Sequence, residues 1–273
     1  MKKTSLFLLA SMFACYAFSQ GNLLINPVRV VFDGTNNNTD LNLTNIGKDT
    51  AVYKVSFVSY KMLENGSFLQ LEKADTAQAA DKFLRLFPRK VILPPNESQT
   101  IRLQLRKPAS LKTGEYRSHI YFRAEKENSP LGMKDKRLDS TKMAVSITPV
   151  FGISIPIIVR HGTLSNKLSL TDLNLVSVND SISKLNLTIN RNGDKSAYGN
   201  LKVIYQPLKG KDIEIAFVNG IGIYTEINKR FFSLPIPINN IKINKGSKII
   251  VRFLLPSEQG GSELCRSELV IAD

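Results

Sequence analysis

Residues 145–157 read VSITPVFGISIPI and form the centre of the longest strand candidate in the chain, 143–160. Apolar residues alternate here with small or polar ones, which is the pattern of a strand with one apolar and one polar face. The apolar face comprises Val145, Ile147, Phe151, Ile153, Ile155 and Ile157. Proline cannot donate a hydrogen bond to a neighbouring strand, so Pro149 and Pro156 indicate an edge strand or a bulge.

Two interpretations of this strand remain open from its pattern. It can be the ordinary last strand of a sandwich, with its apolar face in its own core. Alternatively, it can protrude beyond the core and add its edge to the sheet of another polypeptide, where alternate side chains fill pockets. An uncovered apolar edge would promote aggregation, so natural proteins normally shorten it or place charges on it.

Similar short runs of β-branched and aromatic residues recur on both sides of this segment, separated by Asn, Gly, Asp, Ser and Pro. The pair Asn65-Gly66 lies between two such runs and predicts a hairpin. Seven or eight short strands in each half predict an all-β protein with two immunoglobulin-like β-sandwich domains. We place them at residues 20–161 and 162–273.

Residues 1–19 have the features of an export signal. Lys2 and Lys3 precede an apolar run that is too short to span a bilayer. The small residues Ala17 and Ser19 then mark an expected cleavage site after Ser19. Cleavage there would lower the net charge from +14 to +12. The signal predicts that the mature protein is periplasmic. Cys15 could carry a lipid anchor instead, but the bulky Phe13 before it disfavours a lipoprotein cleavage site.

The net charge of +14 raises the possibility of nucleic-acid binding. However, Lys and Arg are dispersed between apolar residues, as in Ile101-Arg102-Leu103, which is typical of the solvated face of a strand. Catalytic motifs are also lacking. His119 and His161 have no nucleophile motif near them, and together with Cys265 they lack the spacing of metal ligands. We therefore expect no enzymatic activity, no cofactor, no metal and no nucleic-acid partner.

Several separated segments resemble one known family, the PapD-like periplasmic pilus (fimbrial) chaperones. In the first half these segments are 27–34 (PVRVVFDG), 41–45 (LNLTN), 87–94 (FPRKVILP), 98–103 (SQTIRL) and 114–122 (GEYRSHIYF). In the second half, 187–205 is similar to the opening strands of the C-terminal domain of divergent members. The resemblance implies two immunoglobulin-like domains and a partner that is a pilus subunit lacking one strand.

The resemblance also implies roles for individual residues. The strand that the chaperone inserts into the subunit would present Val145, Ile147, Pro149, Phe151 and Ile153. Family members hold the terminal carboxylate of the subunit with one arginine and one lysine, and Arg29 matches the arginine. The alternative is that Arg29 is a solvated strand residue.

Pro156 stands where the family's lysine is expected. Either another cation supplies the second contact or strand addition alone holds the partner. The candidate cations are Arg102, Arg123 and Arg160.

The sequence thus predicts a periplasmic chaperone that caps a pilus or surface-fibre subunit by donor-strand complementation and delivers it for assembly. An outer-membrane usher is a further expected partner, and self-association through the donor strand is possible. The alternative is a structural β-sandwich protein of the cell surface or of the fibre itself, without chaperone activity.

Overall fold

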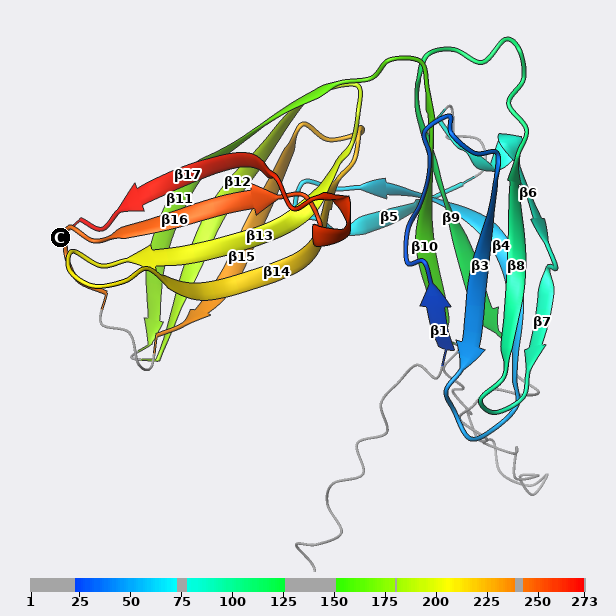
Figure 1. Cartoon of the computed structure of the whole chain (residues 1–273), viewed down its shortest axis with the longest axis horizontal. Coiled ribbons are helices and arrows are strands. Elements are labelled where there is room, and N and C mark those ends of the chain that lie inside the picture. The colour runs from blue at the N-terminus through cyan, green and yellow to red at the C-terminus, as the bar shows by residue number, and fades with distance from the viewer. Residues whose placement is uncertain (1–22, 73–77, 126–150, 180, 239–242, 273) are drawn as a thin grey trace, which may run out of the picture.

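A computed structural model describes residues 23–72, 78–125, 151–179, 181–238 and 243–272. The described chain folds into two β-sandwiches (Figure 1). The prediction of an all-β protein with two immunoglobulin-like sandwiches is confirmed. In the part of the chain that the structure describes, the helical elements are the short 3-10 turns η2 (Asp81–Phe83) and η4 (Ser257–Gln259). Across the described ranges, no helix is both long and apolar enough to cross a membrane.

The first sandwich contains two sheets. One has the order β1-β3-β8-β6, with bounds β1 (Leu23–Asn26), β3 (Asn38–Asn45), β8 (Ser98–Leu105) and β6 (Leu84–Phe87). The other has the order β2-β10-β9-β4-β5, with β7 paired to β4, and its bounds are β2 (Val30–Phe32), β10 (Gly152–His161), β9 (Gly114–Ala124), β4 (Ala51–Met62), β5 (Phe68–Leu71) and β7 (Lys90–Leu93). The first sheet corresponds to the A-B-E-D sheet of an immunoglobulin domain.

The second sandwich also contains two sheets. One has the order β11-β12-β15, with bounds β11 (Asn166–Asn179), β12 (Ile182–Gly193) and β15 (Lys229–Pro237). The other has the order β14-β13-β16-β17, with bounds β14 (Ile213–Ile223), β13 (Ala197–Gln206), β16 (Lys248–Leu254) and β17 (Glu263–Val270). The chain enters this sandwich after β10 ends at His161.

Alternation along the strands determines which side chains form the two cores. In β3 and β8, Leu41, Leu43, Ile101 and Leu103 point inward and are fully buried, while the residues between them face solvent or the sheet edge. β10 differs because Ile158 is buried as well as its neighbours. Ile158 packs in the core of the second sandwich, so this part of β10 is buried on both faces.

The β4–β5 hairpin links the two sandwiches and extends from the first toward the second (Figure 1). The Asn65-Gly66 hairpin prediction is therefore confirmed. The Glu64 carbonyl accepts a hydrogen bond of 2.7 Å from the Phe231 backbone N–H of the second sandwich. Gly66 has a φ of +83°, and a Cβ there would lie 2.7 Å from the Arg230 guanidinium, so this turn favours glycine for two reasons.

Candidate functional site

One edge of β10 lacks a complete neighbour. β9 pairs with β10 along its whole length, from Gly152 opposite Arg123 to His161 opposite Gly114. On the other edge, β2 pairs only with Ile157–Val159. Within the described ranges, no strand therefore covers the second edge of residues 152–156. Pro156 lies where the open edge meets β2, consistent with the expected edge position of a residue that has no N–H to donate.

The apolar row of β10 leaves the core along this open edge. Ile157 and Ile155 are buried, with exposed fractions of 0% and 4%. Ile153 is only partly buried against the same core, and Phe151 is 40% exposed. Burial thus decreases steadily toward residue 150, although the residue type stays apolar. Such a row provides side chains that a second polypeptide could cover.

The remaining candidate donor residues are not placed. Val145, Ile147 and Pro149 lie outside the described residues. Of the five candidates, the structure describes Phe151 and Ile153, and the Phe151 carbonyl accepts a hydrogen bond of 3.0 Å from the Ala124 N–H on β9. The role of all five as donor side chains stays a prediction.

Arg29 lies between β1 and β2 and reaches the second sandwich. Its guanidinium carbon is 4.4 Å from the ring centroid of Tyr198 and 5.5 Å from that of Tyr224. Its Nη1 donates a hydrogen bond of 3.3 Å to the Tyr224 hydroxyl. The segment that carries Arg29 therefore places its charge where the two sandwiches meet.

The charge of Arg29 is poorly solvated. Burial lowers the pKa of Arg29 below its ordinary value, and neighbouring Arg160 lowers it too. Tyr224, Glu115 and Tyr198 act in the opposite direction and raise it. Arginine nevertheless stays protonated in proteins. No ion pair to Arg29 is found among the described residues, so a partly buried cation remains that an anionic ligand would stabilise.

The three candidate second cations occupy different places. Arg160 lies close to Arg29 but forms an ion pair of 3.0 Å with the buried Glu115. Glu115 also accepts a hydrogen bond of 3.1 Å from the Ser196 N–H, which joins the two sandwiches. Arg123 is exposed on β9, opposite Gly152.

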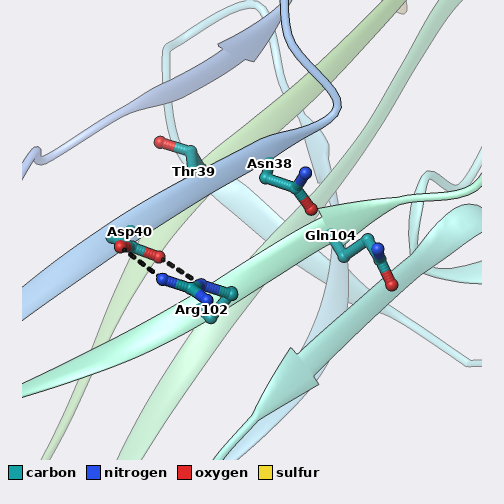
Figure 2. A pocket seen from close by; sticks show the side chains of 5 residues that line it. All are labelled: Asn38, Thr39, Asp40, Arg102 and Gln104. Atoms are coloured by element: carbon teal, nitrogen blue, oxygen red, sulfur yellow. Dashed lines mark hydrogen bonds and ion pairs between the residues drawn. The ribbon is translucent and has the colours of Figure 1, made fainter.

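Arg102 lies on β8, in the other sheet of the first sandwich. It forms a bidentate pair with Asp40, at 3.0 and 3.2 Å, in a shallow pocket on the outer face of that sheet (Figure 2). The side chain of Arg102 is 70% exposed, so this ion pair adds little to stability. Of the three candidates, Arg160 is the one whose charge lowers the pKa of Arg29.

Known proteins provide a comparison for this arrangement. No protein-family model matches the sequence, and no curated protein matches it. Among solved structures, the chain is similar to the class 5 fimbriae chaperone CfaA, with a TM-score of 0.44 and 17% identity over 92% of this chain and 100% of that one.

The chain is also similar to the Pseudomonas aeruginosa chaperone CupB2, with a TM-score of 0.43 and 9% identity over 91% of this chain and 100% of that one. A further similarity is to the structure of the Salmonella enterica SafA pilin in complex with the SafB chaperone, with a TM-score of 0.41 and 14% identity over 93% of this chain and 99% of that one. The chain resembles fimbrial chaperones. At identities this low, the properties of its site depend on its own side chains.

Arg117 is a residue of the site that sequence reasoning missed. Its Nη2 donates to the Tyr60 carbonyl at 2.6 Å and to Glu226 of the second sandwich. The Met62 N–H also donates to Glu226, at 2.8 Å. The guanidinium lies 3.7 Å from the ring centroid of Tyr224, the tyrosine that holds Arg29. Nothing in the sequence marks contacts between residues so far apart.

His119 lies beside Arg117 in the same region. Its ring contacts Tyr60 and Phe68 edge-on, with centroids 5.0 and 5.8 Å away, and its buried Nδ1 has no hydrogen-bond partner in the described structure. Burial, together with the nearby positive charges of Arg117 and Arg29, lowers the pKa of His119 from 6.5 to about 3. The imidazole is therefore neutral at neutral pH.

This shift predicts a pH dependence of stability. Between pH 6.5 and about 3 the unfolded state binds a proton that the folded state excludes. The free energy of unfolding should therefore fall with falling pH in this window, by up to about 1.4 kcal/mol per pH unit from this group. Urea unfolding at pH 7 and 4.5 measures the slope, which His119→Phe should reduce. Equal slopes in His119→Phe and the control His161→Phe would contradict the prediction.

Proposed function

We propose that this protein is a periplasmic chaperone, without enzymatic activity and independent of ATP, that binds and caps a pilus or surface-fibre subunit by donor-strand complementation. The observation that carries the proposal is the apolar row of β10, which leaves its own core along an open edge. Ile153 is partly exposed and Phe151 is 40% exposed there. An edge of this kind would aggregate unless a partner covers it.

The mechanism follows from the geometry of that edge. The unpaired backbone groups of residues 152–155 would bond to a strand of the subunit, and the row continued by Phe151 would fill the apolar groove that the subunit's missing strand leaves open. Burial of apolar surface would contribute about 25 cal/mol per Å² before the costs of association are subtracted. The chaperone would thereby protect the subunit until it is delivered for assembly, with an outer-membrane usher as the expected recipient.

Arg29 would bind the carboxylate at the end of the subunit. Its guanidinium is held at the junction of the sandwiches and lacks an acidic partner among the described residues. A carboxylate can accept two parallel charge-assisted hydrogen bonds from one guanidinium, which would neutralise the poorly solvated charge. Arg160, being paired with Glu115, is less available for this contact.

Co-expression in the periplasm with exported, short β-sandwich subunits tests the proposal. The wild-type chain should co-purify with a subunit, and Phe151→Ser together with Ile153→Ser should lower the yield of complex at least tenfold. Phe217→Ser is the matched control, because Phe217 is 45% exposed on β14, far from this edge. If no subunit co-purifies, or if both sets of variants bind equally, the proposed chaperone function fails.

A further inference from the structure

The environment of Arg29 is built by both sandwiches. Arg29 itself belongs to the first sandwich, in the segment between β1 and β2. Tyr198, on β13, and Tyr224, just after β14, belong to the second. The two tyrosines contact the same guanidinium, one through its ring face and the other through its hydroxyl.

The two contacts fix different properties of the guanidinium. The Tyr198 ring, 4.4 Å from the guanidinium carbon, attracts the cation and covers one side of it. The Tyr224 hydroxyl accepts one N–H of Nη1 at 3.3 Å and so determines the orientation of the fork. A free arginine side chain would lose about 2 kcal/mol of rotamer entropy on binding. A guanidinium that is already oriented loses less, so its ligand binds more tightly.

Tyr224 is itself held on its other side. Arg117 lies 3.7 Å from the Tyr224 ring centroid, and Glu226 accepts hydrogen bonds from both Arg117 and the Met62 N–H. Tyr224 is only 5% exposed, which leaves its ring little freedom to move. The contacts that join the sandwiches thus also position the hydroxyl that orients Arg29.

We propose that Tyr198 and Tyr224 are positioning residues for Arg29, so that the second sandwich completes the carboxylate-binding site of the first. The inference rests on the proposed function and deepens it, since it assigns to the second sandwich a role in recognising the end of the subunit. The two aromatic residues compensate for the absence of a lysine at Pro156, because they orient and desolvate the single arginine instead of adding a second charge.

Two synthetic peptides of alternating Val and Thr residues, one ending in a free carboxylate and the other in an amide, test the inference. The measured quantity is the ratio of their dissociation constants for the full chain. We expect the free carboxylate to bind about tenfold more tightly to the wild type. Arg29→Gln should abolish the preference, while Tyr198→Leu and Tyr224→Phe should each reduce it about two- to tenfold. Tyr198→Phe keeps the ring and should restore most of it.

A matched control and a second readout separate positioning from general damage. Tyr116→Phe removes a hydroxyl bonded to the Lys112 carbonyl in the first sandwich and should leave the preference unchanged. The ¹⁵N–H resonance of the Arg29 Nε, assigned with Arg29→Lys, reports the ring directly and needs no ligand. It should shift in Tyr198→Leu, because the ring current is lost, and stay near its wild-type position in Tyr198→Phe.

The outcomes distinguish the two proposals. A wild-type chain that binds both peptides equally, or neither, contradicts the carboxylate site of the proposed function. Two other results overturn the positioning role alone. One is a carboxylate-over-amide preference in Tyr198→Leu and Tyr224→Phe that equals the wild-type preference. The other is an Arg29 Nε resonance that does not shift in Tyr198→Leu.

Discussion

Replacing Arg191 by lysine is expected to lower the free energy of unfolding by about 3 kcal/mol, although the charge is retained. Arg191 is 2% exposed in β12. Its Nε and Nη2 donate to the Ile227 carbonyl, both at 3.1 Å. The other acceptors are the carbonyls of Gly193 (2.6 Å), Lys195 (3.3 Å) and Thr225 (3.1 Å) and the Asn228 side-chain oxygen (3.0 Å).

The reason for the large effect is the shape of the guanidinium. A planar fork with five N–H groups can reach acceptors in two segments at once, 193–195 and 225–228, whereas an ammonium group is a compact point charge with three donors. Lysine would leave several of these acceptors without a donor; the Ile227 carbonyl is the buried one, and an unsatisfied buried group costs about 1–3 kcal/mol. Residues 225–228 follow Tyr224 and include Glu226, so the loss would also loosen the junction that orients Arg29.

Urea unfolding of Arg191→Lys measures the change, with Arg252→Lys as the control. Arg252 pairs with Glu263 on the surface, with its side chain 39% exposed, and its replacement should cost less than about 1 kcal/mol. Equal losses in the two variants would show that Arg191 contributes only its charge. The carboxylate-over-amide preference should fall with Arg191→Lys and not with Arg252→Lys.

The elements predictable from the sequence are those set by local patterns. Alternation and turn residues predicted two sandwiches and the hairpin at Asn65-Gly66, because the side-chain period of a strand and the backbone freedom of glycine act over a few residues. The edge position of Pro156 followed from its missing N–H in the same way.

The junction could not be predicted in that way, because its contacts depend on how the strands are paired and packed. Arg117 and Glu226 are 109 positions apart, and Arg29 and Tyr224 are 195 apart. A cation on a strand looks the same in the sequence whether it faces solvent, as Arg102 does, or an acid in the interior, as Arg160 does. Only the register of β9 and β10 places Arg117 and His119 on the face toward the second sandwich.

The same junction explains why two sandwiches serve one proposed site. Met62 and Ile158 of the first sandwich are buried in the core of the second, so the interface between them has an apolar centre. Around that centre lie the Arg117–Glu226 and Arg160–Glu115 pairs. Both acids are already paired with arginines, and among the described residues Arg29 has no acidic partner.

Removal of the Glu226 carboxylate is expected to have the second large effect, a loss of about 3 kcal/mol in the free energy of unfolding for Glu226→Ala. The side chains of Arg117 and Glu226 are only 9% and 20% exposed, so the variant leaves a buried cation without its acid. The Met62 N–H loses its acceptor as well. Since both partners of Glu226 belong to the first sandwich, the two sandwiches should also unfold less cooperatively, and calorimetry should show a broader or divided transition.

The Arg102–Asp40 pair is the natural control, because it is also an arginine–carboxylate pair but lies on a surface where the side chains are 70% and 43% exposed. Asp40→Ala should cost less than about 1 kcal/mol and leave one transition. The double variant Glu226→Ala with Arg117→Leu should recover part of the lost free energy of unfolding, because the unpaired charge of Arg117 is then removed as well. If Glu226→Ala costs no more than Asp40→Ala, the Arg117–Glu226 pair does not hold the sandwiches together, and the positioning of Tyr224 must depend on the apolar centre formed by Met62 and Ile158.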